Sequence, residues 1–425
     1  MNIYLDTVGC RLNQGEIETF ARQFRAAGHQ LVAHPDQADL VVINTCTVTA
    51  AAASDSRQRI RQAARAGGPC VVATGCWVTL EPEQAASLPG VSQVIHNLDK
   101  DRLVPIVLQT PAEAFNLEFI ERTPIPGTRL RTRAFIKVQD GCDNRCTFCI
   151  TSIARGPARS RPIHDVLSDV RAALHGGAQE IVLTGVHLGA WGTDLIPGQR
   201  LQHLVQAILA DTEIPRLRLS SLEPWGLQPE FFALWQDPRL CRHLHLPLQS
   251  GCAATLRRMA RKTTPASFAS LLQTARAAIP HLAVTTDVIV GFPGETEAEF
   301  EQSLDFVRSM HFSGGHVFTY SERPGTAAAR MPGSVPHVER KLRNARMQAV
   351  LAESEAAYHQ SFLGMQLDVL WESAKAHVTQ GWELSGLTDN YLRVQSHSQA
   401  QLWNCITPVQ LTACTNRGLV GTIRV

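Results

Sequence analysis

The sequence predicts an α/β protein in three parts: a small parallel α/β domain, a central partial (β/α) barrel and a small C-terminal β-barrel. Three observations support this fold class. Short β-branched runs alternate with helical patterns in residues 1–105, as in a parallel sheet with crossover helices. About six strand–helix units follow in residues 131–335, which indicates an incomplete (β/α) barrel. Residues 363–425 then carry only short strands and turn residues, which is typical of a small β-barrel.

Composition limits the classes of function. The chain has 425 residues, of which 44% are hydrophobic, enough for several domains of roughly 100–200 residues each. The formal charge of +2 does not by itself indicate a nucleic-acid partner, so any RNA contact must come from local basic patches. We expect no signal peptide and no membrane partner, because we find no basic start followed by an apolar run and no apolar stretch of about 20 residues. The 11 cysteines are therefore expected in the reducing cytoplasm, where clustered thiols favour metal binding or catalysis over disulfides.

Residues 1–105 contain three candidates for buried strands, with helices between them. Glycine follows both helical patterns, as it does at many helix ends. The strands are predicted at residues 2–8, 39–45 and 70–74, and the helices at residues 14–27 and 54–66.

A cysteine follows each of these three strands, at Cys10, Cys46 and Cys76. The carboxyl ends of the strands line one crevice in an open α/β sheet, so the three thiols should converge although they are far apart in the sequence. The alternative is three buried structural cysteines, since free cysteine is often buried. The repeated position at a strand end favours a metal-binding triplet.

Residues 106–130 are predicted to form a linker, because residues 123–127 contain two prolines and a glycine. The barrel follows, and its active site should lie at the carboxyl ends of its strands. Strands are expected at residues 134–138, 180–184, 217–221, 243–246, 284–290 and 316–319, and helices at residues 163–175, 202–210, 264–278 and 295–310.

The first barrel strand leads into a loop with three cysteines at C-x-x-x-C-x-x-C spacing: Cys142, Cys146 and Cys149. One loop with this spacing can wrap three thiolates around a compact soft-metal centre. A 4Fe–4S cubane bound by three thiolates keeps one iron open, and that iron can chelate a small molecule. A zinc site normally needs a fourth protein ligand nearby, and no cysteine follows before Cys241. Structural zinc is the alternative.

Polar residues follow the later strands, where a barrel active site would lie. They are Gly185, Ser221, Glu223, Gln249 and Ser250. A glycine lets backbone groups approach a ligand, and the carboxylate, amide and hydroxyl groups could bond an amino acid or a nucleoside. The alternative for any one of them is an ordinary surface or turn residue.

Two basic clusters lie near the expected barrel mouth. Arg155 and Arg159 follow the cysteine loop, and Arg257 and Arg258 follow the segment of Gln249. Arg161 belongs to the first cluster, and Arg261 and Lys262 belong to the second. Both clusters could hold RNA phosphates. The alternative is that these arginines are solvated or face a small ligand.

A long helical pattern at residues 334–362 joins the barrel to the C-terminal part, so that residues 336–362 form a connecting helix. Short strands are expected at residues 366–371, 377–380, 391–394, 407–412 and 421–425. Basic and acidic residues balance here, so charge alone does not indicate RNA binding. Aromatic stacking on single-stranded RNA is possible, although core packing is the expected role of Trp371, Trp382, Tyr391 and Trp403.

These motifs resemble a known family. The cysteine loop, with Phe148 before its last cysteine, resembles the radical S-adenosylmethionine (SAM) superfamily. Residues 9–16, 44–48 and 74–76 resemble the three cysteine motifs of the methylthiotransferases, whose N-terminal domain binds a second 4Fe–4S cluster. Residues 386–394 resemble the C-terminal TRAM domain, an RNA-binding barrel. The resemblance therefore spans nearly the whole chain.

The resemblance implies a set of cofactors, a reaction and a site. Two 4Fe–4S clusters are expected, and one SAM would donate a methyl group to sulfur at the N-terminal cluster. A second SAM would be cleaved at the loop cluster, and the resulting radical would activate an inert C–H bond that acid–base side chains cannot activate. The expected ligands are Cys10, Cys46 and Cys76 for one cluster, Cys142, Cys146 and Cys149 for the other, and Phe148, Gly185, Ser221, Glu223, Gln249 and Ser250 for SAM.

The family has three branches with different substrates. Two act on a modified adenosine beside the tRNA anticodon, and one acts on an aspartate of a ribosomal protein. Residues 10–14, 138–142, 324–328 and 388–394 look most like the branch that uses N6-threonylcarbamoyladenosine at position 37, so the tRNA anticodon loop is the expected partner. The alternatives are the isopentenyladenosine branch, the ribosomal-protein branch and a non-catalytic RNA-binding protein with structural metal. We also expect a monomer that receives electrons from a donor such as flavodoxin or ferredoxin.

Overall fold

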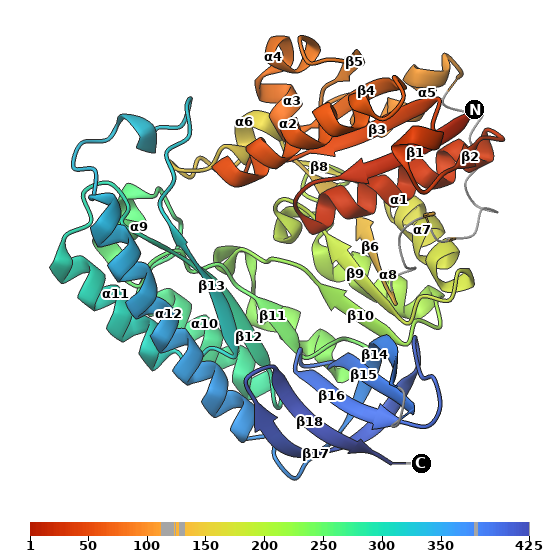
Figure 1. The fold of residues 1–425 in the computed structure, drawn as a ribbon. Coiled ribbons are helices and arrows are strands. Elements are labelled where there is room, and N and C mark those ends of the chain that lie inside the picture. Colours follow the sequence, from red (N-terminus) through yellow and green to blue (C-terminus); the bar gives the residue numbers. More distant parts are fainter. Residues whose placement is uncertain (112–122, 124, 127–131, 378–380, 425) are drawn as a thin grey trace.

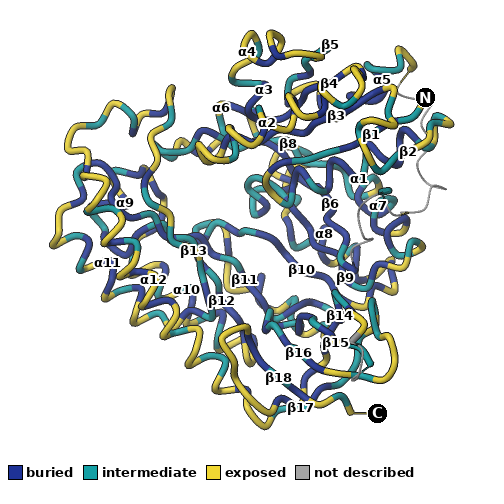
Figure 2. Tube along the Cα trace, viewed as in Figure 1, coloured by how far each residue is buried: buried dark blue, intermediate teal, exposed yellow. Residues whose placement is uncertain are grey.

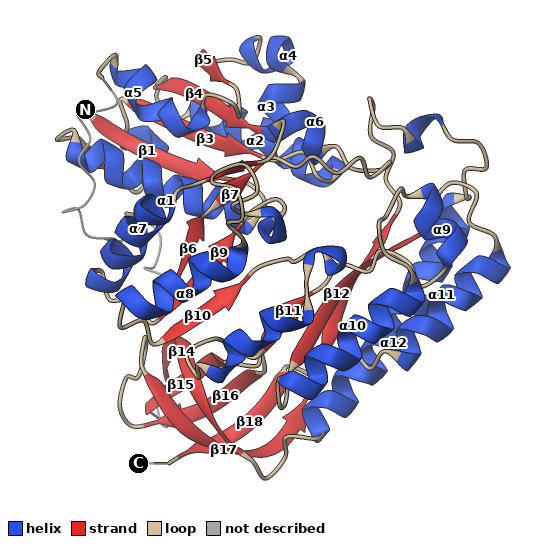
Figure 3. Cartoon of the chain, turned by 180° about the vertical axis from the view of Figure 1, so that it is seen from behind, coloured by secondary structure: helices blue, strands red, loops and turns tan. Residues whose placement is uncertain are grey.

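The computed structural model describes residues 1–425 except residues 112–122, 124, 127–131, 378–380 and 425. Figure 1 shows an N-terminal sheet, two central sheets and a C-terminal barrel, with the long helix α12 (His337–Gln360) along one side. The view from behind in Figure 3 shows the same three parts. The predicted α/β fold class is confirmed. In the described part of the chain, no helix is long and apolar enough to span a bilayer.

The N-terminal part is a parallel sheet in the order β2-β1-β3-β4-β5. The three predicted strands are β1, β3 and β4, which are direct neighbours. The edge strands β2 and β5 were not predicted, because β2 has two residues and β5 is mostly half-buried. The bounds are β1 (Asn2–Thr7), β2 (Gln30–Leu31), β3 (Leu40–Thr45), β4 (Cys70–Gly75), β5 (Val91–Ile95), α1 (Arg11–Ala26), α2 (Ala50–Arg65), α3 (Cys76–Leu80), α4 (Pro82–Ala86) and α5 (Leu103–Leu108).

Both faces of this sheet are covered, as a parallel sheet requires. Val42 of β3 faces Phe20 of α1 in one buried cluster, and Val41 faces Ile60 of α2 in another. All six residues of β3 are buried, and Figure 2 shows the buried trace along the strands with exposed turns at the outside. Helices therefore bury the sheet on both faces.

The central part consists of six parallel strands in chain order. Two sheets, β10-β9-β6 and β11-β12-β13, are joined by single parallel bridges between residues 217 and 240 and between residues 221 and 245. Among the described residues no pairing joins β6 to β13, so the barrel is open, as predicted. The bounds are β6 (Arg133–Lys137), β9 (Glu180–Thr184), β10 (Arg216–Leu219), β11 (His243–His245), β12 (Ala283–Val290), β13 (Gly314–Thr319), α7 (Ile163–His175), α8 (Leu201–Asp211), α9 (Ala253–Arg258), α10 (Pro265–Ala278) and α11 (Glu297–Ser309).

The C-terminal part is a closed barrel in the order β14-β15-β16-β18-β17. The strand predictions here were partly wrong. Strand β15 was missed, and the strand predicted at residues 377–380 is largely outside the described residues. The strand predicted from Tyr391 begins later, because Tyr391 lies in a turn with φ of 68°. The bounds are β14 (Gln366–His377), β15 (Gly381–Thr388), β16 (Arg393–Ser398), β17 (Ile406–Thr415) and β18 (Gly418–Ile423).

The predicted linker at residues 106–130 is described only in part. Helix α5 covers its first residues, and most of the remainder is outside the described residues. The predicted connecting helix corresponds to α12.

Candidate active site

The N-terminal triplet, Cys10, Cys46 and Cys76, lies at the carboxyl ends of three adjacent strands. Cys10 directly precedes α1, Cys46 follows β3, and Cys76 begins α3. Gly9 has φ of 103°, and a Cβ there would lie 2.6 Å from the sulfur of Cys46. Gly75 has the same φ, and a Cβ there would lie 2.3 Å from a backbone oxygen of the neighbouring strand. Only glycine permits such close approach in this conformation, so the triplet is compact.

The loop triplet, Cys142, Cys146 and Cys149, is held at its base by the hairpin of β7 (Gln139–Asp140) and β8 (Arg159–Ser160). Gly141 opens the loop at φ of 67°, and a Cβ there would lie 1.8 Å from a backbone oxygen on the returning segment. The amide of Cys142 donates to the same returning segment at 3.0 Å. The loop is therefore closed on itself before the first cysteine.

The far side of this loop is fixed to the barrel. The amide of Thr147 donates to the carbonyl oxygen of Met259 at 3.1 Å, and its hydroxyl donates to that of Arg258 at 2.8 Å. Phe148 packs edge-to-face on Phe292 with ring centroids 6.4 Å apart. These contacts orient the loop triplet toward the barrel interior.

Both triplets line one cavity of about 1400 Å³. Predicted ligand-binding residues on its wall are Phe148, Gly185, Ser221, Glu223 and Gln249. Ser250 does not line it: the side chain is fully buried, and its hydroxyl contacts Ser303 and accepts from the amide of Cys252. The Ser250 side chain, predicted as a cofactor ligand, therefore does not reach the cavity, because the segment after β11 turns its hydroxyl into the core.

The donor set of the cavity fits iron–sulfur clusters. All six thiols are free of disulfides, and burial raises the pKa of Cys10, Cys46, Cys142 and Cys146, so metal binding must release their protons. Among the described residues, no three ligating side chains surround one point where a single ion would sit. A cubane does not require this, because each thiolate binds a different iron atom.

Glu223 is held in place by Arg261. The guanidinium of Arg261 contacts the carboxylate at 2.6 Å and donates to the carbonyl oxygen of Pro247 at 2.7 Å. It also lies 4.4 Å from the ring centroid of Trp225 and 3.8 Å from the sulfur of Cys146. Arg261 thus ties a predicted SAM-binding carboxylate to the loop triplet, a role that sequence spacing did not reveal.

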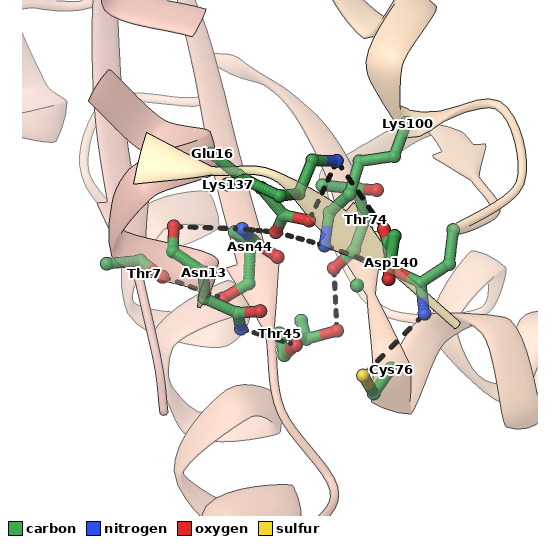
Figure 4. A network of polar contacts seen from close by, with 12 residues as sticks. Thr7, Asn13, Glu16, Asn44, Thr45, Thr74, Cys76, Lys100, Lys137 and Asp140 are labelled. Carbon is green, nitrogen blue, oxygen red and sulfur yellow. Dashed lines mark hydrogen bonds and ion pairs between the residues drawn. The ribbon is translucent and has the colours of Figure 1, made fainter. Parts of the chain in front are cut away.

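A buried polar network joins the two triplets, and Glu16 is its centre. Its carboxylate contacts Lys100 at 2.7 Å, Arg155 at 3.1 Å and Lys137 at 3.5 Å, and it accepts from Asn44 at 2.9 Å. Figure 4 shows the side chains of Glu16, Asn44, Lys100 and Lys137 pointing toward one another. Burial alone would raise the pKa of Glu16, but the three cations hold it well below its usual value.

The network reaches cysteines of the N-terminal triplet. Asn13 accepts from the guanidinium of Arg155 at 2.7 Å and lies 3.7 Å from the sulfur of Cys10. Asn97 donates to the sulfur of Cys76 at 3.6 Å and to a carbonyl oxygen of α6 (Thr151–Arg155), the helix after the loop triplet, at 2.8 Å. Asn13 and Asn97 were missed as site residues: Asn13 lies within the motif of Cys10, but its contact with Arg155 joins distant parts of the chain, and Asn97 lies in no recognised motif.

The structure corrects part of the predicted RNA-binding set. Arg155 is 1% exposed and fully engaged in the network, so it cannot contact RNA. Arg159 is half-buried and donates to the backbone of Arg155 at 3.2 Å. Arg258 is paired with Glu299 at 2.5 Å, whereas Arg257 is exposed. Proximity in sequence to a site does not show which way a guanidinium points.

The C-terminal barrel also contributes to the cavity wall. Tyr391, Arg393 and Arg417 line it, together with Arg11 and His243 from the other two parts. All three parts of the chain therefore enclose the same space.

Comparison with known proteins identifies the family. The chain matches the Radical SAM superfamily over residues 136–307 and the family described as Uncharacterized protein family UPF0004 over residues 2–96. It is 36% identical to the threonylcarbamoyladenosine tRNA methylthiotransferase MtaB of Bacillus subtilis, over 91% of this chain and 88% of that protein. It is 34% identical to the ribosomal protein uS12 methylthiotransferase RimO of Desulforudis audaxviator, over 89% of this chain and 87% of that protein.

A solved structure shares the fold. The radical S-adenosylmethionine methyltransferase TsrM from Kitasatospora setae superposes with a TM-score of 0.57 at 15% identity, over 77% of this chain and 75% of that chain. The identity and coverage of the curated relatives carry the family assignment. The chain belongs to the radical SAM methylthiotransferases, and it is a transferase that uses 4Fe–4S clusters and S-adenosylmethionine.

Proposed function

We propose that this enzyme inserts a methylthio group at C2 of N6-threonylcarbamoyladenosine, at position 37 beside the tRNA anticodon. The observation that carries the proposal is the single cavity that both cysteine triplets line. A sulfur carrier and a radical generator must reach the same substrate atom, and one shared cavity allows this. The alternatives within the family are isopentenyladenosine in tRNA and an aspartate of a ribosomal protein.

In this proposal each of the three parts of the chain has its own role in cluster binding or tRNA binding. Residues 1–105 hold one cluster through the N-terminal triplet, and residues 131–335 hold the other through the loop triplet, with residues 106–130 as the linker. Residues 336–362 connect to residues 363–425, a TRAM-like barrel for tRNA. A 4Fe–4S cluster held by Cys142, Cys146 and Cys149 would supply the electron that cleaves SAM.

In this proposal, residues of the cavity wall bind and orient SAM. Glu223, fixed by Arg261 at 2.6 Å, accepts from the hydroxyl or ammonium groups of SAM. Gln249 has φ of 70°, and its backbone joins β12 through bonds of 2.8 Å to residues 287 and 289. This conformation is uncommon for a residue other than glycine, and it leaves the Gln249 side chain on the cavity wall.

The chemistry of the wall favours a polar substrate arm over an apolar one. Arg11 and Arg417 line the cavity, and in the described part of the chain neither forms an ion pair with a carboxylate. An isopentenyl arm offers such guanidinium groups no acceptor, whereas a threonylcarbamoyl arm brings a carboxylate, a hydroxyl and amide groups. This supports the threonylcarbamoyl substrate, as does the similarity to MtaB.

Nucleoside mass spectrometry tests the proposal. The gene is expressed in a bacterial strain that lacks its own enzyme for this modification, and total tRNA is digested. We expect 2-methylthio-N6-threonylcarbamoyladenosine to appear. Its absence, with a methylthio mass on isopentenyladenosine or on ribosomal protein uS12 instead, would assign the enzyme to another branch.

The proposal also includes the partners. The tRNA anticodon loop enters the cavity, and a small electron-transfer protein such as flavodoxin or ferredoxin reduces the loop cluster of a monomeric enzyme. Reduction by purified flavodoxin, followed as 5′-deoxyadenosine formation, tests the donor. Sedimentation of the loaded enzyme tests the monomer.

A further inference from the structure

Tyr391 places a phenol from the C-terminal barrel inside the shared cavity. Its ring stacks on His243 with centroids 4.2 Å apart and planes 9° apart. The guanidinium of Arg218 lies 5.1 Å from the same ring centroid. The phenolic oxygen accepts a hydrogen bond of 2.8 Å from Arg11, the residue that directly follows Cys10. One side chain of the third part of the protein therefore contacts a residue beside the N-terminal triplet.

Hydrogen bonds and an ion pair fix the turn that carries Tyr391 to the central part of the chain. Arg216 donates to the carbonyl oxygen of Leu387 at 3.0 Å, and Arg218 donates to those of residues 388 and 389 at 3.2 and 2.9 Å. Arg242 forms an ion pair with Asp389 at 2.6 Å. Left-handed backbone costs a residue other than glycine about 1–2 kcal/mol, so the φ of 68° at Tyr391 is maintained by these contacts. These contacts therefore fix the position of the Tyr391 phenol in the cavity.

Arg11 differs from the other interior arginines of the site. Arg155, Arg218 and Arg261 each contact a carboxylate within 3.1 Å. In the described part of the chain, the recorded side-chain partner of Arg11 is the hydroxyl of Tyr391, and no carboxylate lies within ion-pair distance of it. A guanidinium has five N–H donors, so Arg11, which lines the cavity, has donors left for a ligand.

The surroundings of the phenolic oxygen are electropositive. Burial alone would raise the pKa of Tyr391, but the charges of Arg11, Arg133 and Arg218 outweigh it and hold that pKa below its usual value. The phenolic oxygen accepts from Arg11, and its own proton has no recorded acceptor among the described residues. An anion placed here would receive N–H donors from Arg11 and an O–H donor from Tyr391.

We propose that Arg11 and Tyr391 bind the carboxylate of the threonyl arm of the substrate base and thereby select this substrate. This inference rests on the proposed function. In adenine, C2 and the carbon that bears N6 are bonded to the same ring nitrogen, so an arm on N6 lies at the same edge of the base as C2. A group that holds the arm must then lie close to the sulfur carrier. Arg11 meets this condition, because it directly follows Cys10.

Arg11 and Tyr391 would distinguish substrates because a base whose N6 arm has no carboxylate cannot pair with them. A planar guanidinium binds a carboxylate through two parallel hydrogen bonds. An arm without charge forfeits this pairing, and a site built to hydrogen-bond one substrate group discriminates strongly against an analogue that lacks it. Arg11 and Tyr391 are therefore specificity residues, outside both the cluster ligands and the predicted SAM-binding set.

The test removes the charge of the substrate carboxylate in one arm and the charge of Arg11 in the other. Two synthetic tRNA anticodon stem–loops carry N6-threonylcarbamoyladenosine, one as the free acid and one as its methyl ester. Their dissociation constants are measured by fluorescence anisotropy with the reconstituted enzyme and SAM. The variants are Arg11→Met, Arg11→Lys, Tyr391→Phe and, as a matched control, Arg61→Met, which removes one exposed arginine on α2 away from the cavity.

We expect the wild type and the Arg61→Met control to bind the acid about 10- to 100-fold more tightly than the ester, the usual range for a hydrogen-bonded charge. Arg11→Met should bind the two alike, Arg11→Lys should keep part of the preference, and Tyr391→Phe, which keeps the ring on His243, should reduce it. Iron and sulfide content and far-UV circular dichroism show whether a variant is folded and loaded.

The two proposals fail in different ways. If the wild type methylthiolates the acid stem–loop but Arg11→Met and Tyr391→Phe keep the full preference for the acid, the carboxylate is bound elsewhere and only the inference falls. If the wild type does not methylthiolate the acid stem–loop at all, the proposed function falls, and the assignment of Arg11 and Tyr391 falls with it.

Discussion

The guanidinium of Arg155 contacts the carboxylate of Glu16 at 3.1 Å, and each residue lies six positions after a cysteine of a different triplet. The same guanidinium contacts Asp140 at 2.9 Å, and both Arg155 and Glu16 are almost completely buried. The pair joins helix α1 of the N-terminal part to the segment after the loop triplet. It therefore fixes the spacing of the two cysteine sites from within the protein.

Loss of Arg155 should destabilise the fold. Removing one partner of a buried ion pair typically costs about 3–5 kcal/mol, because the other charge is left uncompensated. Lys100 and Lys137 still contact Glu16, so for Arg155→Met we expect the free energy of unfolding to fall by about 3 kcal/mol. Urea unfolding of the metal-free protein measures it.

The matched control is Arg346→Met. This arginine also contacts two carboxylates, those of Glu297 and Glu301, but its side chain is 44% exposed. Exposed pairs contribute about 0–1 kcal/mol, so a small change is expected. Equal losses for Arg155→Met and Arg346→Met would show that the buried network does not hold the two parts together.

A second contact between the same parts predicts a dependence on pH. Asp169 of α7 contacts Arg22 of α1 at 2.7 Å and Arg161 at 2.6 Å. Burial alone would raise the pKa of the Asp169 carboxyl, but the two arginines hold it below its usual value. Its contribution to stability is therefore present above the unfolded-state pKa of about 3.9 and is lost as the pH falls through the folded-state pKa.

Urea unfolding at several pH values measures this contribution in the wild type and in Asp169→Asn. The difference in unfolding free energy should be constant from about pH 5 to 7 and shrink below about pH 4. A difference that grows on acidification would contradict the assignment of Asp169 as a charged partner.

Gly141 should be essential for the loop triplet. Its φ is 67°, and a Cβ would lie 1.8 Å from a backbone oxygen, so Gly141→Ala must open the base of the loop. We expect the reconstituted protein to lose about four irons, one cubane, while the N-terminal triplet keeps its own. Gly68→Ala is the control, because Gly68 has φ of 76° with nothing within 4 Å of the added methyl group. Full iron content in Gly141→Ala would show that the closed loop is not required.

Arg261 should control SAM binding through Glu223. Arg261→Met removes the contact of 2.6 Å that fixes the carboxylate and the contact with the Trp225 ring. We expect SAM to bind roughly 10-fold more weakly, the loss of about one charge-assisted hydrogen bond. Equilibrium dialysis with labelled SAM measures it, and Arg258→Met, which breaks a pair with Glu299 away from the cavity, should leave SAM binding unchanged. Unchanged SAM affinity in Arg261→Met would remove Glu223 from the SAM site.

Sequence patterns predicted the features that depend on local periodicity and on strand order, such as the main strands and the cysteines at their ends. Cys10, Cys46 and Cys76 could be placed together, because the carboxyl ends of parallel strands share one edge. Arg155 was placed wrongly, because its partner Glu16 is 139 positions away and no local pattern reveals such a contact. Strand β15 was missed, because its run contains glycines and a glutamate that weaken a strand pattern. Tyr391 was assigned to packing, because its turn is set by arginines of another part of the chain.

The most direct test of the account compares two triple variants of the full-length, anaerobically reconstituted enzyme. With a stem–loop that carries N6-threonylcarbamoyladenosine, 5′-deoxyadenosine and the methylthio nucleoside are measured in the same reaction. The variant with Cys10, Cys46 and Cys76 changed to alanine should still cleave SAM and form no methylthio nucleoside, while the variant with Cys142, Cys146 and Cys149 changed should do neither. Methylthio nucleoside from the first variant, or SAM cleavage by the second, would contradict the division of work between the two triplets.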